Sequence, residues 1–179
     1  MRLFDRIFRK QDHEIANPTI SWSDPLGQVP MLVPYEGRFG DLKFGAPLED
    51  AMSFGRPVRF RWIQKDYCEL LYARRGFQID FEDNRFASAA FFMDQHVAEP
   101  DVAGGFDPAL LNLVLRDDNI GELSRRSTRD VITGYFGSPS QIDSDTDETI
   151  LTFEVAGLTL EFEMHPKTNT LMRFNIYPI

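Results

Sequence analysis

The sequence has only one cysteine, Cys68, among its 179 residues. A single thiol excludes both an internal disulfide and a metal site built from several thiolates. Cys68 lies in a strand-like run from Asp66 to Leu71, where a cysteine usually serves as a small buried hydrophobe. Its neighbours Asp66 and Glu69 are acidic, whereas a reactive thiolate needs positive charge nearby. We therefore predict that Cys68 is buried and inert.

Long hydrophobic runs are also lacking. No apolar run reaches the ~18 residues that a transmembrane helix needs, so no membrane-spanning segment is expected. Residues 1–10 contain neither the apolar core of a signal peptide nor the cysteine of a lipoprotein. We expect a cytoplasmic protein.

Basic charge is scarce, especially toward the C-terminus. The formal net charge is −9, and residues 138–164 contain no lysine or arginine. The acidic residues of that stretch are Asp143, Asp145, Asp147, Glu148, Glu154, Glu161 and Glu163. Binding to nucleic acid requires phosphate neutralisation, so the charge argues against a nucleic-acid partner. It favours a basic protein as the partner.

The sequence also lacks recognisable catalytic motifs. It has no glycine-rich phosphate loop and no nucleophile elbow. Its histidines, His13, His96 and His165, have no spacing typical of metal ligands. We predict a protein that is not an enzyme and needs no cofactor.

One short acidic motif is a weak candidate for a metal site. Asp143, Asp145 and Asp147 alternate as the first ligands of a calcium loop do, and Glu154 falls at the twelfth position. Glu148 stands where that loop requires glycine, and a strand-like segment follows instead of a helix. We favour a solvated acidic hairpin loop and predict no metal site.

The most informative positive feature is an internal correspondence between two stretches of the chain. Gly40-Asp41-Leu42 is matched 81 positions later by Gly121-Glu122-Leu123, and Phe77, Ile79 and Phe81 are matched by Leu158, Leu160 and Phe162. The string Phe54-Gly55-Arg56-Pro57 recurs as Phe136-Gly137-Ser138-Pro139. Self-similarity at a fixed spacing indicates duplicated structural units.

Turn residues and hydrophobic periodicity divide the chain into four parts. These are an N-terminal segment over residues 1–37, a first unit over 38–93, a linker over 94–106 and a second unit over 107–179. Helices are expected over 47–54, 107–115 and 127–136, and alternating residues predict antiparallel strands between them. The predicted fold class is α+β, with two tandem repeats, each with helices packed on one face of an antiparallel sheet.

The two units resemble a known family. The run Gly-Asp-Leu-Lys-Phe-Gly-x-Pro-Leu-Glu-Asp over residues 40–50, followed by a short helix, Phe-Gly-x-Pro and antiparallel strands, resembles the repeat of the beta-lactamase inhibitor protein. Small outer-membrane assembly lipoproteins share that unit in single copy, and some toxin-immunity proteins are built similarly. The resemblance covers residues 40–93 and about 107–177. It implies that exposed sheet faces form a concave surface that grips a partner protein.

The residues of this surface follow from the alternation of the strands. Side chains opposite the apolar positions face away from the core. We predict that a partner contacts Gln78, Asp80, Glu161, Glu163, Arg173 and Tyr177, and that the protein is a binding module, for example an immunity or inhibitor protein.

An alternative function starts from the N-terminus. Over residues 2–10, Leu3, Phe4 and Ile7 share one helical face, opposite basic residues. Such a helix would anchor an accessory or regulatory subunit to a complex or a membrane surface.

Overall fold

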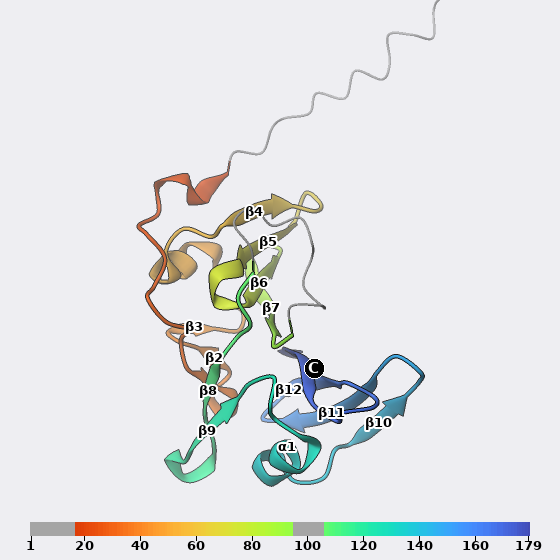
Figure 1. Ribbon diagram of the computed structural model, residues 1–179. Coiled ribbons are helices and arrows are strands. Elements are labelled where there is room, and N and C mark those ends of the chain that lie inside the picture. The colour runs from red at the N-terminus through yellow and green to blue at the C-terminus, as the bar shows by residue number, and fades with distance from the viewer. Residues whose placement is uncertain (1–16, 95–105) are drawn as a thin grey trace, which may run out of the picture.

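The computed structural model describes residues 17–94 and 106–179. The predicted helix over 2–10 and nearly all of the linker lie outside these residues. The described chain is mostly β: it forms an eight-stranded sheet and a five-stranded sheet, which face each other across a shared core (Figure 1).

The eight-stranded sheet runs in the order β10-β11-β12-β13-β7-β6-β5-β4, and every neighbouring pair is antiparallel. Its strands are β4 (Arg59–Trp62), β5 (Tyr67–Tyr72), β6 (Phe77–Glu82), β7 (Arg85–Phe92), β10 (Gln141–Ser144), β11 (Thr149–Val155), β12 (Leu158–Met164) and β13 (Leu171–Pro178). Four strands come from each half of the chain, and β7 pairs with β13 where the halves meet.

The five-stranded sheet runs in the order β3-β2-β1-β8-β9. Its strands are β1 (Leu32–Val33), β2 (Arg38–Phe39), β3 (Leu42–Lys43), β8 (Leu111–Val114) and β9 (Ile120–Leu123). The halves meet here too, because β1 runs parallel to β8 with Leu32 opposite Leu113.

The described helices are short. They are η1 (Pro18–Ser21), η2 (Pro34–Glu36), η3 (Leu48–Phe54), η4 (Ala73–Arg75), η6 (Arg116–Asp118) and α1 (Arg129–Phe136). All but α1 are 3-10 turns, and η3 occupies the range where an α-helix was expected. Pro47 and Gly55 bound η3 to seven residues, too few for a stable α-helix without strong tertiary packing.

The predicted α+β fold of two tandem repeats is wrong. Each sheet contains strands from both halves of the chain, so neither half has a separate sheet covered by its own helices. The expected helix over 107–115 is also wrong, because this segment contains β8. Leu111 and Leu113 are fully buried with the more accessible Asn112 between them, which is the period of a strand.

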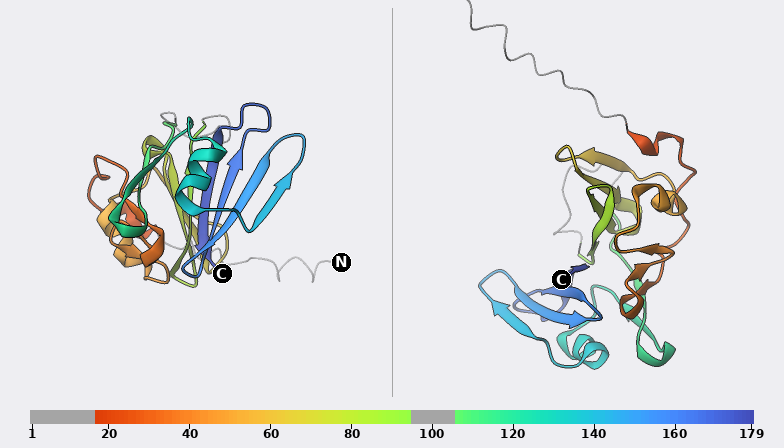
Figure 2. Two further views of the ribbon diagram at one scale, coloured as in Figure 1. Left: turned by 90° about the horizontal axis from the view of Figure 1, so that it is seen from below. Right: turned by 180° about the vertical axis from the view of Figure 1, so that it is seen from behind.

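The core is strongly aromatic and lies between the two sheets. Phe39 of β2 contacts Phe77 of β6 and Phe91 of β7 edge-on, with ring centroids 5.1 Å apart in both pairs. Phe136 at the end of α1 contacts Phe153 and Phe162 on the larger sheet. The smaller sheet, η3 and α1 therefore cover the same face of the larger sheet, as Figure 2 shows from below.

Within the described residues, no helix is both long enough and apolar enough to cross a membrane.

Two glycines with left-handed backbones offer a matched test of this packing. Gly76 (φ +68°) has no room for a side chain, because an added Cβ would lie 2.3 Å from the Ala109 nitrogen. Gly157 (φ +81°) has nothing within 4 Å. We expect Gly157→Ala to lower the free energy of unfolding by about 1 kcal/mol through its φ alone. Gly76→Ala adds a backbone clash and should cost about 2–5 kcal/mol in urea denaturation. If the two variants lose the same free energy of unfolding, Ala109 does not pack closely against Gly76.

Candidate functional site

The predicted contact residues lie on one face of the larger sheet. Along β12, Leu160 and Phe162 point into the core, so Glu161 and Glu163 point to the opposite face. Gln78 and Asp80 do the same on β6. Because β13 pairs with β7 and β7 with β6, the two groups belong to the same face of a continuous sheet. We call it the polar face.

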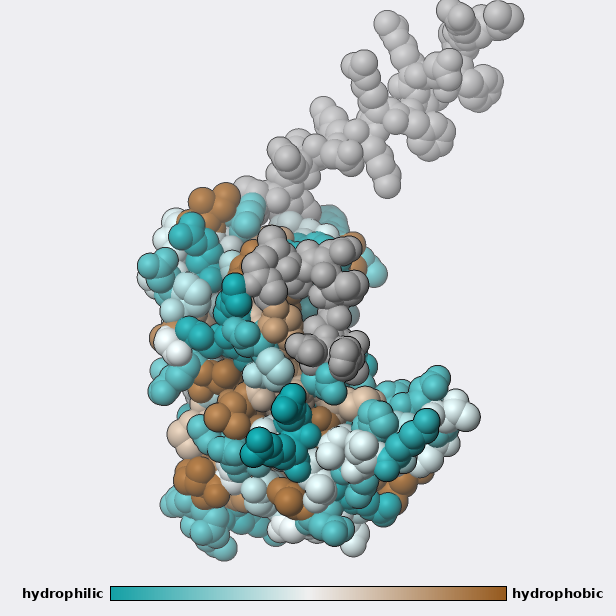
Figure 3. Space-filling view, viewed as in Figure 1, coloured by the Kyte–Doolittle hydropathy of each residue, from teal (hydrophilic) through white to brown (hydrophobic). Residues whose placement is uncertain are grey.

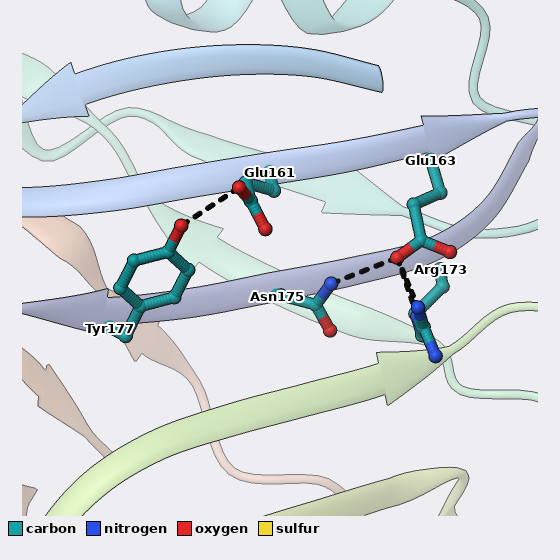
Figure 4. A network of polar contacts seen from close by, with 5 residues as sticks. All are labelled: Glu161, Glu163, Arg173, Asn175 and Tyr177. Atoms are coloured by element: carbon teal, nitrogen blue, oxygen red, sulfur yellow. Dashed lines mark hydrogen bonds and ion pairs between the residues drawn. The ribbon is translucent and has the colours of Figure 1, made fainter. Parts of the chain in front are cut away.

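Glu163 is the centre of a polar network at the C-terminal part of this face (Figure 4). Its carboxylate accepts hydrogen bonds from Arg173 Nε at 2.7 Å, from a second Arg173 nitrogen, and from Asn175 Nδ2 at 3.1 Å. Glu163 is buried, whereas the Arg173 side chain is 38% exposed. The buried carboxylate therefore fixes a guanidinium that solvent can still reach.

Tyr177 and Glu161 form the second contact of this region. The Tyr177 hydroxyl donates a hydrogen bond of 2.8 Å to Glu161 Oε1. Partial burial, together with this bond and the negative charge of Glu161, raises the pKa of Tyr177 to about 12. Both side chains remain partly exposed, so the phenol ring is oriented at the surface.

The other two predicted contact residues, Gln78 and Asp80, lie on β6 in the N-terminal half of the chain. Asp80 is buried, with an exposed fraction of 6%, and its carboxylate accepts hydrogen bonds from Gln78 Nε2 (2.8 Å) and Ser88 Oγ (2.7 Å). Burial is the main cause that raises the pKa of Asp80, and the two hydrogen bonds oppose it. The hydrogen-bonding capacity of Asp80 is used inside the protein.

Apolar side chains also lie on this part of the sheet. Leu71, Ala73 and Phe92 form a small buried cluster separate from the main core, with Ala90 and Phe106 packed against it. Phe92 and Ala90 belong to the polar face, because they lie opposite Arg173 and Asn175. The polar face thus has an apolar part over β5–β7, where Gln78, Ser88 and Ala90 are half-buried, and a part over β10–β13 that we call the open face.

The open face carries the acidic stretch. Glu154 on β11 and Asp143 on β10 are exposed, and Glu161 lies between Thr152 and Asn175 in the register. In Figure 3, hydrophilic surface predominates on the lobe at the lower right, where Figure 1 places β10–β12.

In the acidic hairpin between β10 and β11, the carboxylates of Asp143 and Asp145 accept hydrogen bonds from neighbouring residues. Asp145 Oδ1 accepts hydrogen bonds from the backbone nitrogens of Asp147 (2.7 Å) and Glu148 (2.9 Å), which lower the pKa of Asp145. Asp143 accepts one from the Gln141 side chain. Among the described residues, no group of three or more His, Cys, Asp or Glu side chains is placed to hold a metal ion.

The remaining candidate residues are the cysteine and the histidines, and Cys68 and His165 are held by contacts within the protein. Cys68 is buried as predicted, and burial, with help from the charges of Asp80 and Glu69, raises the pKa of its thiol to about 12. His165 Nδ1 accepts hydrogen bonds from the backbone nitrogens of Lys167 and Thr168. His13 and His96 lie outside the described residues.

Three residues of these networks were not among the predicted contact residues. Ser88 and Asn175 complete the hydrogen bonding of Asp80 and Glu163, and the pKa of Glu148 is raised by burial and by the nearby charge of Glu163. Asn175 could have been found from its alternation with Phe174 and Ile176. Ser88 and Glu148 depend on strand register, for which the sequence carries no local signal.

Comparison with known proteins gives one structural relative. No protein-family model matches the chain, and no curated protein sequence matches it. Among solved structures, it is similar to the crystal structure of a DUF4309 family protein, YjgB, from Bacillus subtilis, with a TM-score of 0.52. The two chains are 16% identical, over 82% of this chain and 90% of that chain. At this identity the likeness concerns the fold alone, and the resemblance to the beta-lactamase inhibitor protein stays a prediction.

A pair of substitutions separates the roles of the two glutamates. Glu163→Gln removes the charge that holds Arg173 and should lower the free energy of unfolding by about 1–2 kcal/mol, a value reduced because Arg173 is partly exposed. Glu161→Gln keeps an acceptor for Tyr177 at the surface and should change it by less than about 0.5 kcal/mol. Urea denaturation measures both. If the two variants lose the same stability, Glu163 is not the centre of the network.

The buried Asp80 predicts a pH dependence of stability. Because its pKa is higher in the folded protein than the ordinary 3.8, the folded state keeps the proton to a higher pH than the unfolded state does. As the pH rises from 3.8 through the raised pKa, this residue therefore reduces the free energy of unfolding. We expect Asp80→Asn to gain stability relative to the original protein across this window. A difference between the two proteins that does not change with pH would contradict the buried carboxylate.

Proposed function

We propose that this chain is a non-enzymatic protein-binding module and that its contact surface is the open face of β10–β13. One observation carries the proposal. This end of the sheet presents oriented Arg173 and Tyr177 side chains beside an acidic stretch, and the other end of the same face carries an apolar cluster.

Preorganisation of the side chains supports this choice. Arginine and tyrosine are frequent anchors of protein interfaces, because they offer a large contact area together with hydrogen bonds. Glu163 holds Arg173 and Glu161 holds Tyr177 before any partner arrives. A partner then loses less conformational entropy of these side chains on binding.

Charge supports a basic partner. Residues 138–164 carry seven acidic side chains and no basic one, and Asp143, Asp145, Asp147 and Glu154 are exposed. In the N-terminal half, by contrast, Arg61 pairs with Glu69 at 2.7 Å. A surface of one sign steers a partner of the opposite sign and orients it during encounter.

Such binding would suit an immunity or inhibitor protein, the role expected from the sequence. Inhibition of a toxin or an enzyme by occlusion needs a rigid surface and no chemistry of its own, and we place this activity in the cytoplasm. The single free thiol is compatible with a reducing compartment. The accessory-subunit alternative depends on residues 2–10, which lie outside the described chain.

Charge reversal tests the proposal. The purified chain is used to capture a partner from a lysate of the source cells, and the complex is reconstituted from purified components. We expect the double variant Glu154→Lys/Glu161→Lys to weaken binding at least about tenfold by calorimetry, because it reverses charge at the centre of the open face. The affinity of the original protein should also fall as salt is added.

The matched control is Glu49→Lys, an exposed charge reversal on η3 on the other side of the larger sheet. It should leave the affinity unchanged. If Glu49→Lys weakens the complex and the double variant does not, the contact surface lies elsewhere and the proposal fails.

A further inference from the structure

A pocket of about 540 Å³ lies on the N-terminal half, away from the open face. Three segments line it: residues 26–30, the turn between β2 and β3, and the end of η3. Its volume falls within the range of small-ligand sites, which is about 300–1,000 Å³. None of the residues proposed for protein binding contributes to it.

The wall of this pocket is fixed by backbone contacts, although residues 26–30 form no regular structure. The Leu26 nitrogen donates to the Phe54 carbonyl at 3.1 Å, and Arg75 Nε donates to the Leu26 carbonyl at 2.9 Å. Beyond this wall, the Gly40 nitrogen donates to the Met31 carbonyl at 2.8 Å. The pocket is therefore formed before any ligand enters, which lowers the entropy cost of binding.

The chemistry of the lining indicates what would bind. Leu26 and Pro30 provide an apolar surface, to which the ring of Phe54 adds little because that residue is only 2% exposed. Among the described residues, Asp41 is the one charged residue that lines the pocket, and neither its carboxylate nor the Gln28 side chain makes a hydrogen bond or ion pair with another of them. An apolar surface beside an unpaired carboxylate is complementary to a molecule with an apolar body and a positive end.

We propose that this pocket binds a small organic cation, with its apolar or aromatic part against Leu26 and Pro30 and its ammonium group at Asp41. The Ser53 hydroxyl donates to the Asp50 carbonyl at 3.1 Å and keeps its lone pairs for a further N–H of the ligand. Gln28 supplies an amide oxygen at the same pocket. This site is independent of the proposed protein contact.

Benzylamine is a suitable probe, with benzyl alcohol and benzoate as neutral and anionic analogues of similar shape. The full chain, labelled with nitrogen-15, is titrated with each compound while the amide signals of Gly27, Gly40 and Ser53 are followed by NMR. We expect saturable shifts at these amides with benzylamine, at a Kd of about 1 mM for a molecule of this size. Benzyl alcohol should bind several-fold more weakly, and benzoate more weakly still.

Two variants locate the site. Gly27→Leu adds a bulky side chain to the pocket lining without strain, because an added Cβ meets nothing within 4 Å and the backbone is not left-handed, and it should abolish the shifts. Asp41→Asn keeps the shape and should make benzylamine bind no better than benzyl alcohol. Gly134→Leu, at an equally open glycine on α1, should change nothing.

Three results would overturn the proposal of a cation site. It fails if benzylamine gives no saturable shifts, or if it binds Gly27→Leu as well as the original protein. It also fails if Asp41→Asn retains the preference for the cation. The NMR spectrum of each variant without ligand shows whether it is folded, and Asp41→Asn decides the question if Gly27→Leu is not.

Discussion

The pairing of β7 with β13 is the interaction on which the rest of this structure depends. It joins four strands from each half of the chain into one sheet, with Phe91 opposite Phe174 and Ala90 opposite Asn175. The rings of Phe91 and Phe174 stack at 5.5 Å across this junction, and Phe174 stacks on Phe162 at 4.6 Å. Backbone hydrogen bonds and a continuous aromatic core thus stabilise the same joint. The parallel pairing of β1 with β8 joins the halves a second time.

This junction also decides the chemistry of the polar face. Apart from register shifts after Asp80 and after Glu163, the pairing of β6, β7, β13 and β12 keeps Gln78 and Asp80 on the same face as Glu161 and Glu163. The side chains that the strands present on that face differ along it. Over β5–β7, Leu71, Ala73 and Phe92 are buried, and Asp80 is buried with its hydrogen bonds satisfied internally. Over β10–β13, the same alternation leaves an acidic surface with an oriented arginine and tyrosine. Because Glu163 on the open face is as buried as Asp80, the two parts differ in charge and in apolar side chains rather than in the burial of these carboxylates.

Strand positions could be predicted from the sequence more reliably than strand partners. The alternation of Phe77, Ile79 and Phe81 and of Leu158, Leu160 and Phe162 predicts β6 and β12, which the structure contains. Asp107-Pro108 has the features of a helix start, yet Leu111 and Leu113 belong to a buried strand, because pairing with β1 and β9 outweighs local helix signals. The burial of Asp80 could not be predicted, since alternation shows which way a side chain points but not what packs over it. The four C-terminal contact residues were predicted correctly as neighbours on one face, whereas their function stays a proposal.

The central claim is that the open face alone meets a partner, and carboxyl footprinting of the reconstituted complex tests it most directly. Exposed carboxylates are modified in the free chain and in the complex, and the modified positions are found by mass spectrometry. We expect Glu154 and Glu161 to become protected on binding, while Glu36 and Glu49 in the N-terminal half react as before. Protection at Glu36 or Glu49, with Glu154 and Glu161 still reactive, would contradict it.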